Sequence, residues 1–475
     1  MSKIFVFGIG GTGSRVLKAL TMLLAAGVKT KASEIVPIII DPDSACGDKT
    51  DTVAIMNQYS TLFDSLSHQE GENLLDSFST KLSKLDFTSE YVMPMGDNTN
   101  TQFQSYMHFA SLSQENQALV NMLFSKDNQN ADMSIGFTGN PNIGSVVLNQ
   151  FSKSTDFLTF ASNFAPGDKI FIISSIFGGT GASGFPLLLK NLRFIDPTLN
   201  IPNAAAIAAS EIGAITILPY FNVKSEDNAK IDSDSFVSKT KSALSYYERN
   251  LNGLNVLYYI GDSQRGVQEY GDGGIQQRNE ANFVELASAL AIVDFANNSY
   301  TMPSTVYKEF GINKDVADIT FPDLGSTTYN QIAKPLTEFT LFSKYLKERL
   351  HSSTSQVWLE NYVNSVVGGQ FYGILSQFTT AFLNWEQAME SKSHARRFSP
   401  FVLEARPKDV FGLAKGIPVT SAFGVSASNW DLYNHYLNKK DCASSANQIG
   451  KTEEGKFLSH LLLGTKKVVS KKFKF

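Results

Sequence analysis

Two stretches of small residues each interrupt an apolar run, and both could bind phosphate. Residues 8–14 read GIGGTGS and residues 177–184 read FGGTGASG. Glycine lets the main chain turn at positive φ and lets a ligand come close to the backbone. Where such a turn opens a helix, N–H groups and the positive end of the helix dipole point outward, which suits an anion. Each stretch alone could also be a tight strand–helix turn without a ligand.

An acidic pair follows the second apolar run of the chain. Residues 35–40 read IVPIII and lead into DPD, whose acids are Asp41 and Asp43. With the G-x-G-x-x-G that begins at Gly8, such an acid matches the dinucleotide-binding fingerprint, in which the acid contacts a ribose. The pattern also resembles the start of ATP-using enzymes of the ubiquitin-activating type. Both alternatives explain one glycine-rich loop and leave FGGTGASG unexplained, and Asp43 is equally typical of a strand-end turn.

The surrounding pattern predicts an α/β fold with a mostly parallel sheet. Apolar runs typical of buried strands alternate with amphipathic stretches typical of helices. In a parallel sheet the turns that follow the strands lie at one edge, so both glycine-rich stretches should meet there. A long, largely apolar helix is expected at 279–298. The strands are predicted at 3–8, 35–40, 170–174, 213–223 and 255–262.

The sequence changes in character after residue 300. Residues 306–324 read as two short strands or a loop, and long helices are predicted near 330–350 and 370–391. The last ten residues contain five lysines, which could form a solvated end or bind an acidic protein or an anionic membrane. We therefore predict a first domain at 1–300, a smaller, largely helical C-terminal domain at 301–460 and a basic tail at 461–475.

The composition argues against several classes of function. The net charge of −4 over 475 residues gives no general attraction for nucleic acid. The two cysteines and six histidines show no metal-ligand spacing. No window reaches the length of a membrane span, and the apolar run at the N-terminus is short for a signal peptide. We expect a cytoplasmic protein.

Five segments, taken in order, resemble the tubulin/FtsZ superfamily over roughly residues 3–300. The family signature GGGTG[ST]G is similar to FGGTGASG, and the family's first loop is similar to GIGGTGS. The other similar segments are GFTGNPNIG at 136–144, ILPYFNV at 217–223 and NEANFVELASAL at 279–290. The resemblance implies a divergent prokaryotic tubulin-like protein, whose GTP-binding domain has a mostly parallel sheet and a long central helix.

The resemblance also implies which residues hold GTP or GDP. The first and second loops contact the phosphates from two sides, and the third lies near the γ-phosphate. Asn282 takes the place of the residue that reads guanine, and Arg278 replaces a stacking aromatic residue. Asp41 and Asp43 match an acidic loop that could hold Mg²⁺ through water. The implied loop residues are Gly10, Gly11, Thr12, Gly13, Thr138, Gly139, Asn140, Gly178, Gly179, Thr180, Gly181, Ala182 and Ser183.

The implied activity is GTP hydrolysis between subunits. In this family the nucleotide lies between two subunits stacked head to tail, and acids of the next subunit position the attacking water. The resemblance implies that Asn313, Asp315 and Asp318, spaced N-x-D-x-x-D, take this role in a filament-forming, cytoskeletal GTPase. The same segment also reads as a hairpin turn.

Two alternatives to the filament-forming GTPase remain. One is a tubulin-like module that binds a nucleotide without polymerising and serves as a switch or scaffold. The other is a Rossmann-type enzyme that uses NAD or ATP, which the second glycine-rich loop disfavours.

Overall fold

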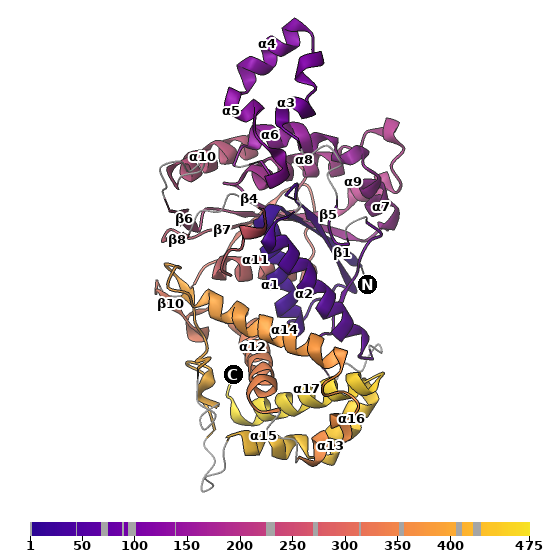
Figure 1. Cartoon of the computed structure of the whole chain (residues 1–475), viewed down its shortest axis with the longest axis vertical. Coiled ribbons are helices and arrows are strands. Elements are labelled where there is room, and N and C mark those ends of the chain that lie inside the picture. Colours follow the sequence, from indigo (N-terminus) through magenta and orange to yellow (C-terminus); the bar gives the residue numbers. More distant parts are fainter. Residues whose placement is uncertain are drawn as a thin grey trace.

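A computed structural model describes most of the chain. It consists of a part built on a parallel sheet and a part made of helices (Figure 1). The predicted α/β fold with a parallel sheet, followed by a largely helical C-terminal region, is confirmed. The described residues are 2–43, 45–67, 75–87, 90–93, 101–137, 139–224, 233–268, 274–312, 315–350, 356–404, 411–420 and 429–475.

Seven parallel strands form the main sheet, in the order β3-β2-β1-β4-β5-β7-β9. The order runs backward from β1 to β3 and forward from β4 to β9, so it reverses between β1 and β4. Ligands of such sheets bind at this reversal, outside the carboxyl ends of the strands. The strands are β1 (Lys3–Ile9), β2 (Glu34–Ile40), β3 (Lys81–Leu82), β4 (Lys169–Ser175), β5 (Glu211–Ile217), β7 (Val256–Ile260) and β9 (Val306–Glu309).

The central strands are mostly apolar because helices cover both faces of the sheet (Figure 1). Every residue of β1 and of β4 after the first lysine is buried. One face is covered by α1 (Gly10–Ala26), α2 (Gly47–Asp64) and α11 (Phe283–Asn297). The other is covered by α6 (Pro141–Val147), α7 (Thr155–Asn163), α8 (Gly179–Arg193) and α10 (Ser233–Asn250).

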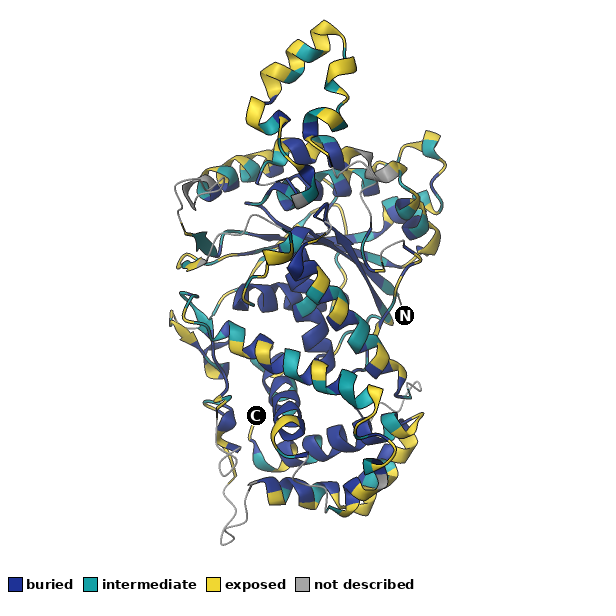
Figure 2. Ribbon diagram, viewed as in Figure 1, coloured by how far each residue is buried: buried dark blue, intermediate teal, exposed yellow. Residues whose placement is uncertain are grey.

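Helix α1 lies at the centre of the molecule. Fifteen of its seventeen residues are buried (Figure 2). It packs against α2 and α11 and also against α12 (Ser326–Glu348), the first long helix of the C-terminal region. Helix α12 of the C-terminal region therefore contributes to the burial of α1.

The C-terminal region is helical, and its last helix packs against the others. Helix α17 begins at Glu453 and ends at Lys472, so most of the segment predicted as a basic tail lies in a helix with buried leucines and valines. Strand β9 follows the predicted boundary at 300 yet pairs with β7. No described helix is both long enough and apolar enough to cross a bilayer. The other helices of this region are α13 (Val357–Val363), α14 (Gln370–Met389), α15 (Asn429–Leu437) and α16 (Lys440–Ile449).

Candidate functional site

The two glycine-rich loops meet at the reversal of strand order. The first joins β1 to α1, and the second joins β4 to α8. Gly10 has a φ of 71°, and a Cβ atom added there would lie 3.5 Å from Cβ of Thr180. The loops are therefore in van der Waals reach of each other across the β1–β4 boundary. Their predicted meeting at one edge of the sheet follows from the parallel topology.

A third glycine-rich segment reaches the same place. A Cβ atom added to Gly179 would lie 3.0 Å from the backbone nitrogen of Asn140 and 3.2 Å from that of Gly139. Thr138, which the family resemblance also assigns to this segment, lies outside the described residues. Gly10, Gly139, Asn140, Gly179 and Thr180 thus belong to three segments that converge on the start of α8.

Both long helices begin here without a side-chain cap. The residues before them, Ile9 and Gly178, make no side-chain capping hydrogen bond, and neither first turn of α1 or α8 contains an acid. The first N–H groups of a helix need acceptors, and an anion can supply them. Two such starts side by side present backbone N–H groups from which an anion such as phosphate can accept.

Several glycines of the loops serve packing within the fold. A Cβ atom added to Gly13 would lie 2.5 Å from the carbonyl carbon of Gly8, and one added to Gly181 would lie 2.5 Å from the carbonyl oxygen of Ser175. At Gly13 and Gly181 the helix presses directly against the end of the preceding strand. A substitution at Gly181 would therefore disrupt the turn itself, and a loss of binding would not report on the position of a ligand. The hydroxyl of Ser183 donates to the Gly179 carbonyl at 2.7 Å, within its own helix.

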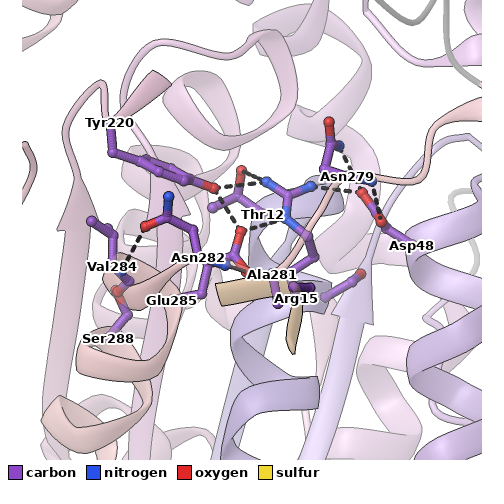
Figure 3. Close-up of polar contacts among 12 residues, drawn as sticks. Thr12, Arg15, Asp48, Tyr220, Asn279, Ala281, Asn282, Val284, Glu285 and Ser288 are labelled. Carbon is purple, nitrogen blue, oxygen red and sulfur yellow. Dashed lines mark hydrogen bonds and ion pairs between the residues drawn. The ribbon is translucent and has the colours of Figure 1, made fainter. Parts of the chain in front are cut away.

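Arg15 lies in α1 just after the first loop and joins three helices and a strand end (Figure 3). Its Nη1 donates to Asp48 of α2 and its Nε to Glu285 of α11, both at 2.6 Å. Its Nη2 donates to the hydroxyl of Tyr220 at 2.8 Å and to that of Thr12 at 3.3 Å. The hydroxyl of Tyr220 in turn donates to Glu285 at 2.8 Å. This Arg15 network fixes the first loop relative to α2, to α11 and to the segment after β5.

The Arg15 network was not predicted from the sequence, although a signal was present. All of its side chains are buried. Burial raises the pKa of Tyr220 well above its ordinary value, so its hydroxyl remains a donor at neutral pH. A charged residue in an otherwise apolar helix, such as Arg15 or Glu285, requires a buried partner. From that requirement, a buried acidic partner for Arg15 could have been predicted.

Asp41 and Asp43 follow β2 at the same edge, and both are buried. The carboxylate of Asp43 accepts from the N–H of Ala45 at 3.0 Å and from that of Gly274 at 2.7 Å. Asp41 accepts from the N–H of Asp43 at 3.1 Å. Burial raises the pKa of Asp41 to about 7, although Lys49 and the Asp43 N–H oppose the shift.

The residues present could give Mg²⁺ only limited support. Each oxygen of Asp43 accepts one backbone hydrogen bond, and Asp41 also accepts one; because a carboxylate oxygen can accept a second bond, both acids are able to contact a metal-bound water. The described residues contain no group of three or more acids, histidines or cysteines that could hold a metal. Mg²⁺ commonly uses one or two carboxylates together with substrate phosphates, and the site fits only that arrangement.

Asn282 begins α11. Its side-chain oxygen accepts from the N–H of Val284 at 2.8 Å, and Oε2 of Glu285 accepts from the N–H of Asn282 at 3.2 Å, which forms a capping box. Its Nδ2 lies 3.2 Å from Nδ1 of His394, which belongs to the C-terminal region. Arg278 is nearby in sequence but more than half exposed, and it forms an ion pair with Asp51 at 3.4 Å. The structure thus uses the side chain of Asn282 to cap a helix.

Asp315 and Asp318 are exposed and paired with arginines. Asp315 lies 2.7 Å from Arg396, and Asp318 accepts two hydrogen bonds from Arg397, at 2.6 and 2.8 Å. Asn313 lies outside the described residues. Strand β9 pairs with β7 and β10 (Asp318–Ile319) pairs with β11 (Arg397–Phe398), while an isolated antiparallel bridge joins Ile312 to Leu324 around this segment. Since β9 runs parallel to β7, the segment after it lies at the carboxyl edge, as the glycine-rich loops do.

Comparison with known proteins gives only distant similarity. No protein-family model and no curated protein matches the chain. Among solved structures, the chain is similar to CetZ from Methanosaeta thermophila strain DSM 6194, with 12% identity and a TM-score of 0.29, covering 62% of this chain and 51% of that one. It is also similar to CetZ2 from Haloferax volcanii in a GTPγS-bound protofilament, with 14% identity and a TM-score of 0.29, covering 62% and 58%.

A third similar structure is an empty FtsZ dimer from M. jannaschii, with 14% identity, a TM-score of 0.25 and coverage of 55% of this chain and 45% of that one. The matches thus span about half the length of these structures. At such TM-scores the likeness carries no argument about function. Any function for this chain has to be inferred from its own geometry and sequence.

Proposed function

We propose that the chain binds a nucleotide whose phosphates lie at the reversal of strand order. The observation that carries this proposal is the convergence of three glycine-rich segments on two uncapped helix starts. Backbone N–H groups supply the binding energy for phosphate at such a place, and glycine leaves room for it. A single glycine-rich turn would be equally consistent with packing alone, whereas the meeting of three such segments at one place favours a ligand.

GTP is the nucleotide that we propose, because the five sequence segments resemble tubulin-like proteins. Arg278 and Asn282 then lie on the base side of the site, and Mg²⁺ would be held mainly by phosphates with support from Asp41 and Asp43. Nδ2 of Asn282 now faces His394 at 3.2 Å. To bind a guanine, this amide would have to give up its contact with His394 and turn to the base.

Nucleotide identification tests the proposal directly. Nucleotide extracted from the purified chain should be GTP or GDP, and calorimetry should give micromolar or tighter binding, about −8 kcal/mol. We expect GTP to be preferred over ATP by about tenfold or more, since an unpaired polar edge costs about 1–3 kcal/mol. Equal affinities would contradict the guanine assignment, and no binding of either nucleotide would contradict the site.

Head-to-tail association with hydrolysis at the joint is a further step that only the resemblance supports. A heterologous contact joins two different faces of the subunit. Asp315 and Asp318, however, lie at the same sheet edge as the glycine-rich segments and are paired with Arg396 and Arg397. The segment from Asn298 to Thr305, at the opposite edge after α11, contains no acid. These observations favour the alternative of a module that binds a nucleotide without polymerising.

The variant Asp318→Ala separates the two candidate functions. In a binding module the variant loses one exposed ion pair, so we expect less than about 1 kcal/mol of stability to be lost and no change in GTP turnover. The measurement is phosphate release per molecule over a hundredfold range of protein concentration. Turnover that rises with concentration in the wild type and disappears in Asp318→Ala would instead support the cross-subunit GTPase.

A further inference from the structure

A buried histidine of the C-terminal region lies against the start of α11. His394, between α14 and β11, is only 5% exposed. Its Nδ1 lies 3.2 Å from Nδ2 of Asn282. Its Nε2 lies 2.9 Å from the carbonyl oxygen of Ala281 and 3.1 Å from that of Ala388. His394 therefore joins α14 to the residue that the proposed function places on the base side of the site.

The two carbonyl groups determine which ring nitrogen of His394 carries a hydrogen. Carbonyl oxygens only accept hydrogen bonds, so Nε2, which faces both of them, is the donor. A hydrogen on Nδ1 would point at the amide hydrogens of Asn282, so Nδ1 is an acceptor. The amide nitrogen of Asn282 thus donates to His394.

Both ends of the Asn282 amide are engaged in this arrangement. Its oxygen accepts from the N–H of Val284 at 2.8 Å, which places its nitrogen on the side of His394 (Figure 3). The O6 atom of guanine is an acceptor and needs a donor such as this nitrogen. The group that a guanine requires is therefore the one that His394 occupies.

The segment that carries His394 is held in place by its own contacts. The hydroxyl of Ser393 donates to Oε2 of Glu280. A Cβ atom added to Gly266, the first residue of β8 (Gly266–Gln268), would lie 1.8 Å from the carbonyl oxygen of Ser393. Because the segment is packed this closely, His394 leaves Asn282 only when something displaces it.

We propose that His394 is a positioning residue that holds the amide of Asn282 away from the base, so that guanine binds only by displacing it. This inference rests on the proposed nucleotide site and adds to it a contact through which the C-terminal region sets guanine affinity. Adenine carries a donor at N6 where guanine carries an acceptor, so the contact weakens GTP binding and leaves ATP binding alone. Coupling between two contacts is reciprocal, so GTP must in turn loosen the segment around His394.

Loss of the histidine should strengthen GTP binding. In His394→Leu the amide nitrogen of Asn282 has no competing acceptor, so calorimetry on the full chain should show GTP bound about 2- to 10-fold more tightly, with ATP affinity unchanged. The matched control is His460→Leu, because His460 is also buried in the C-terminal region and its Nε2 also contacts a carbonyl oxygen, that of Leu437 at 2.7 Å. The control should leave the ratio of GTP to ATP affinity as it is in the wild type.

Hydrogen exchange on the wild-type chain tests the same contact without a substitution. The N–H of His394 donates to the carbonyl oxygen of Ser391 at 3.1 Å and reports on the segment. If guanine displaces His394, the backbone N–H groups of residues 391–398 should exchange faster with GTP bound than without nucleotide. Binding ordinarily stabilises the parts of a protein that it contacts, so faster exchange confined to this segment would mark a displaced contact.

Each outcome decides a separate question. A histidine that only packs would, when replaced, lower stability without raising the ratio of GTP to ATP affinity, and that result would overturn the role of His394 while leaving the nucleotide site in place. Unchanged or slower exchange at 391–398 with GTP would overturn it as well, and this measurement decides alone if His394→Leu does not fold. If the wild-type chain binds neither nucleotide, the proposed function itself is wrong.

Discussion

Replacement of Arg15 by methionine should lower the free energy of unfolding by about 3–5 kcal/mol. Methionine keeps much of the volume of the side chain but removes the positive charge from between Asp48 and Glu285. Both of these acids are buried, and each now lies 2.6 Å from the guanidinium group. Without it two carboxylates remain in the interior with no counter-charge. Chemical denaturation followed by circular dichroism measures the loss.

A control from the same helix separates charge from helix propensity. Lys18 is one of the two residues of α1 that are not buried, so Lys18→Met should change the free energy of unfolding by less than about 0.5 kcal/mol. The double variant Arg15→Met, Glu285→Gln should recover part of the stability, because one uncompensated carboxylate is removed. An Arg15→Met chain as stable as the wild type would contradict the structural role of the network.

A valine at Gly10 should weaken nucleotide binding by at least about 100-fold. Its side chain would enter the space between the first and second loops, since a Cβ atom at Gly10 already lies 3.5 Å from Cβ of Thr180. We propose that phosphate lies at this junction, and the branched side chain would compete with it. Binding is measured by calorimetry with GTP on a chain whose fold has been checked by circular dichroism.

Gly167 supplies the matched control for backbone strain. Its φ is 93°, compared with 71° at Gly10, and nothing lies within 4 Å of a Cβ atom added there. A residue other than glycine at positive φ costs about 1–2 kcal/mol, so both variants should lose similar stability. Gly167→Val should nevertheless bind GTP as the wild type does. If Gly10→Val retains full affinity, phosphate does not lie between these two loops.

The sheet and its loops could be predicted because their signals are local. The run KIFVFGI is apolar after its first residue, as expected for a strand covered on both faces. The glycine-rich turn at its end predicts that a helix follows. Parallel connectivity then brings the loops after β1 and β4 to one edge without further information. Strand β9 was harder to predict, because a four-residue edge strand with three exposed residues lacks the pattern of a buried strand.

The roles of individual side chains in the site depend on distant parts of the chain. Asn282 occupies the position of a base reader in the resemblance, yet its oxygen caps α11 and its Nδ2 faces His394, 112 residues further along. Arg15 and Asp48 are 33 residues apart and meet only after the sheet has formed. Such pairs form only in the tertiary structure, so the local patterns of a single sequence do not reveal them.

The burial of α1 on nearly all sides means that neither half of the molecule is dispensable. A shortened protein that ended near residue 300 would lack α12 and would present apolar side chains of α1 to water. Exposed apolar surface of this kind promotes aggregation. For expression, domain swapping or fusion, the chain should therefore be handled as one unit, with cuts and inserted tags kept to surface loops remote from α1.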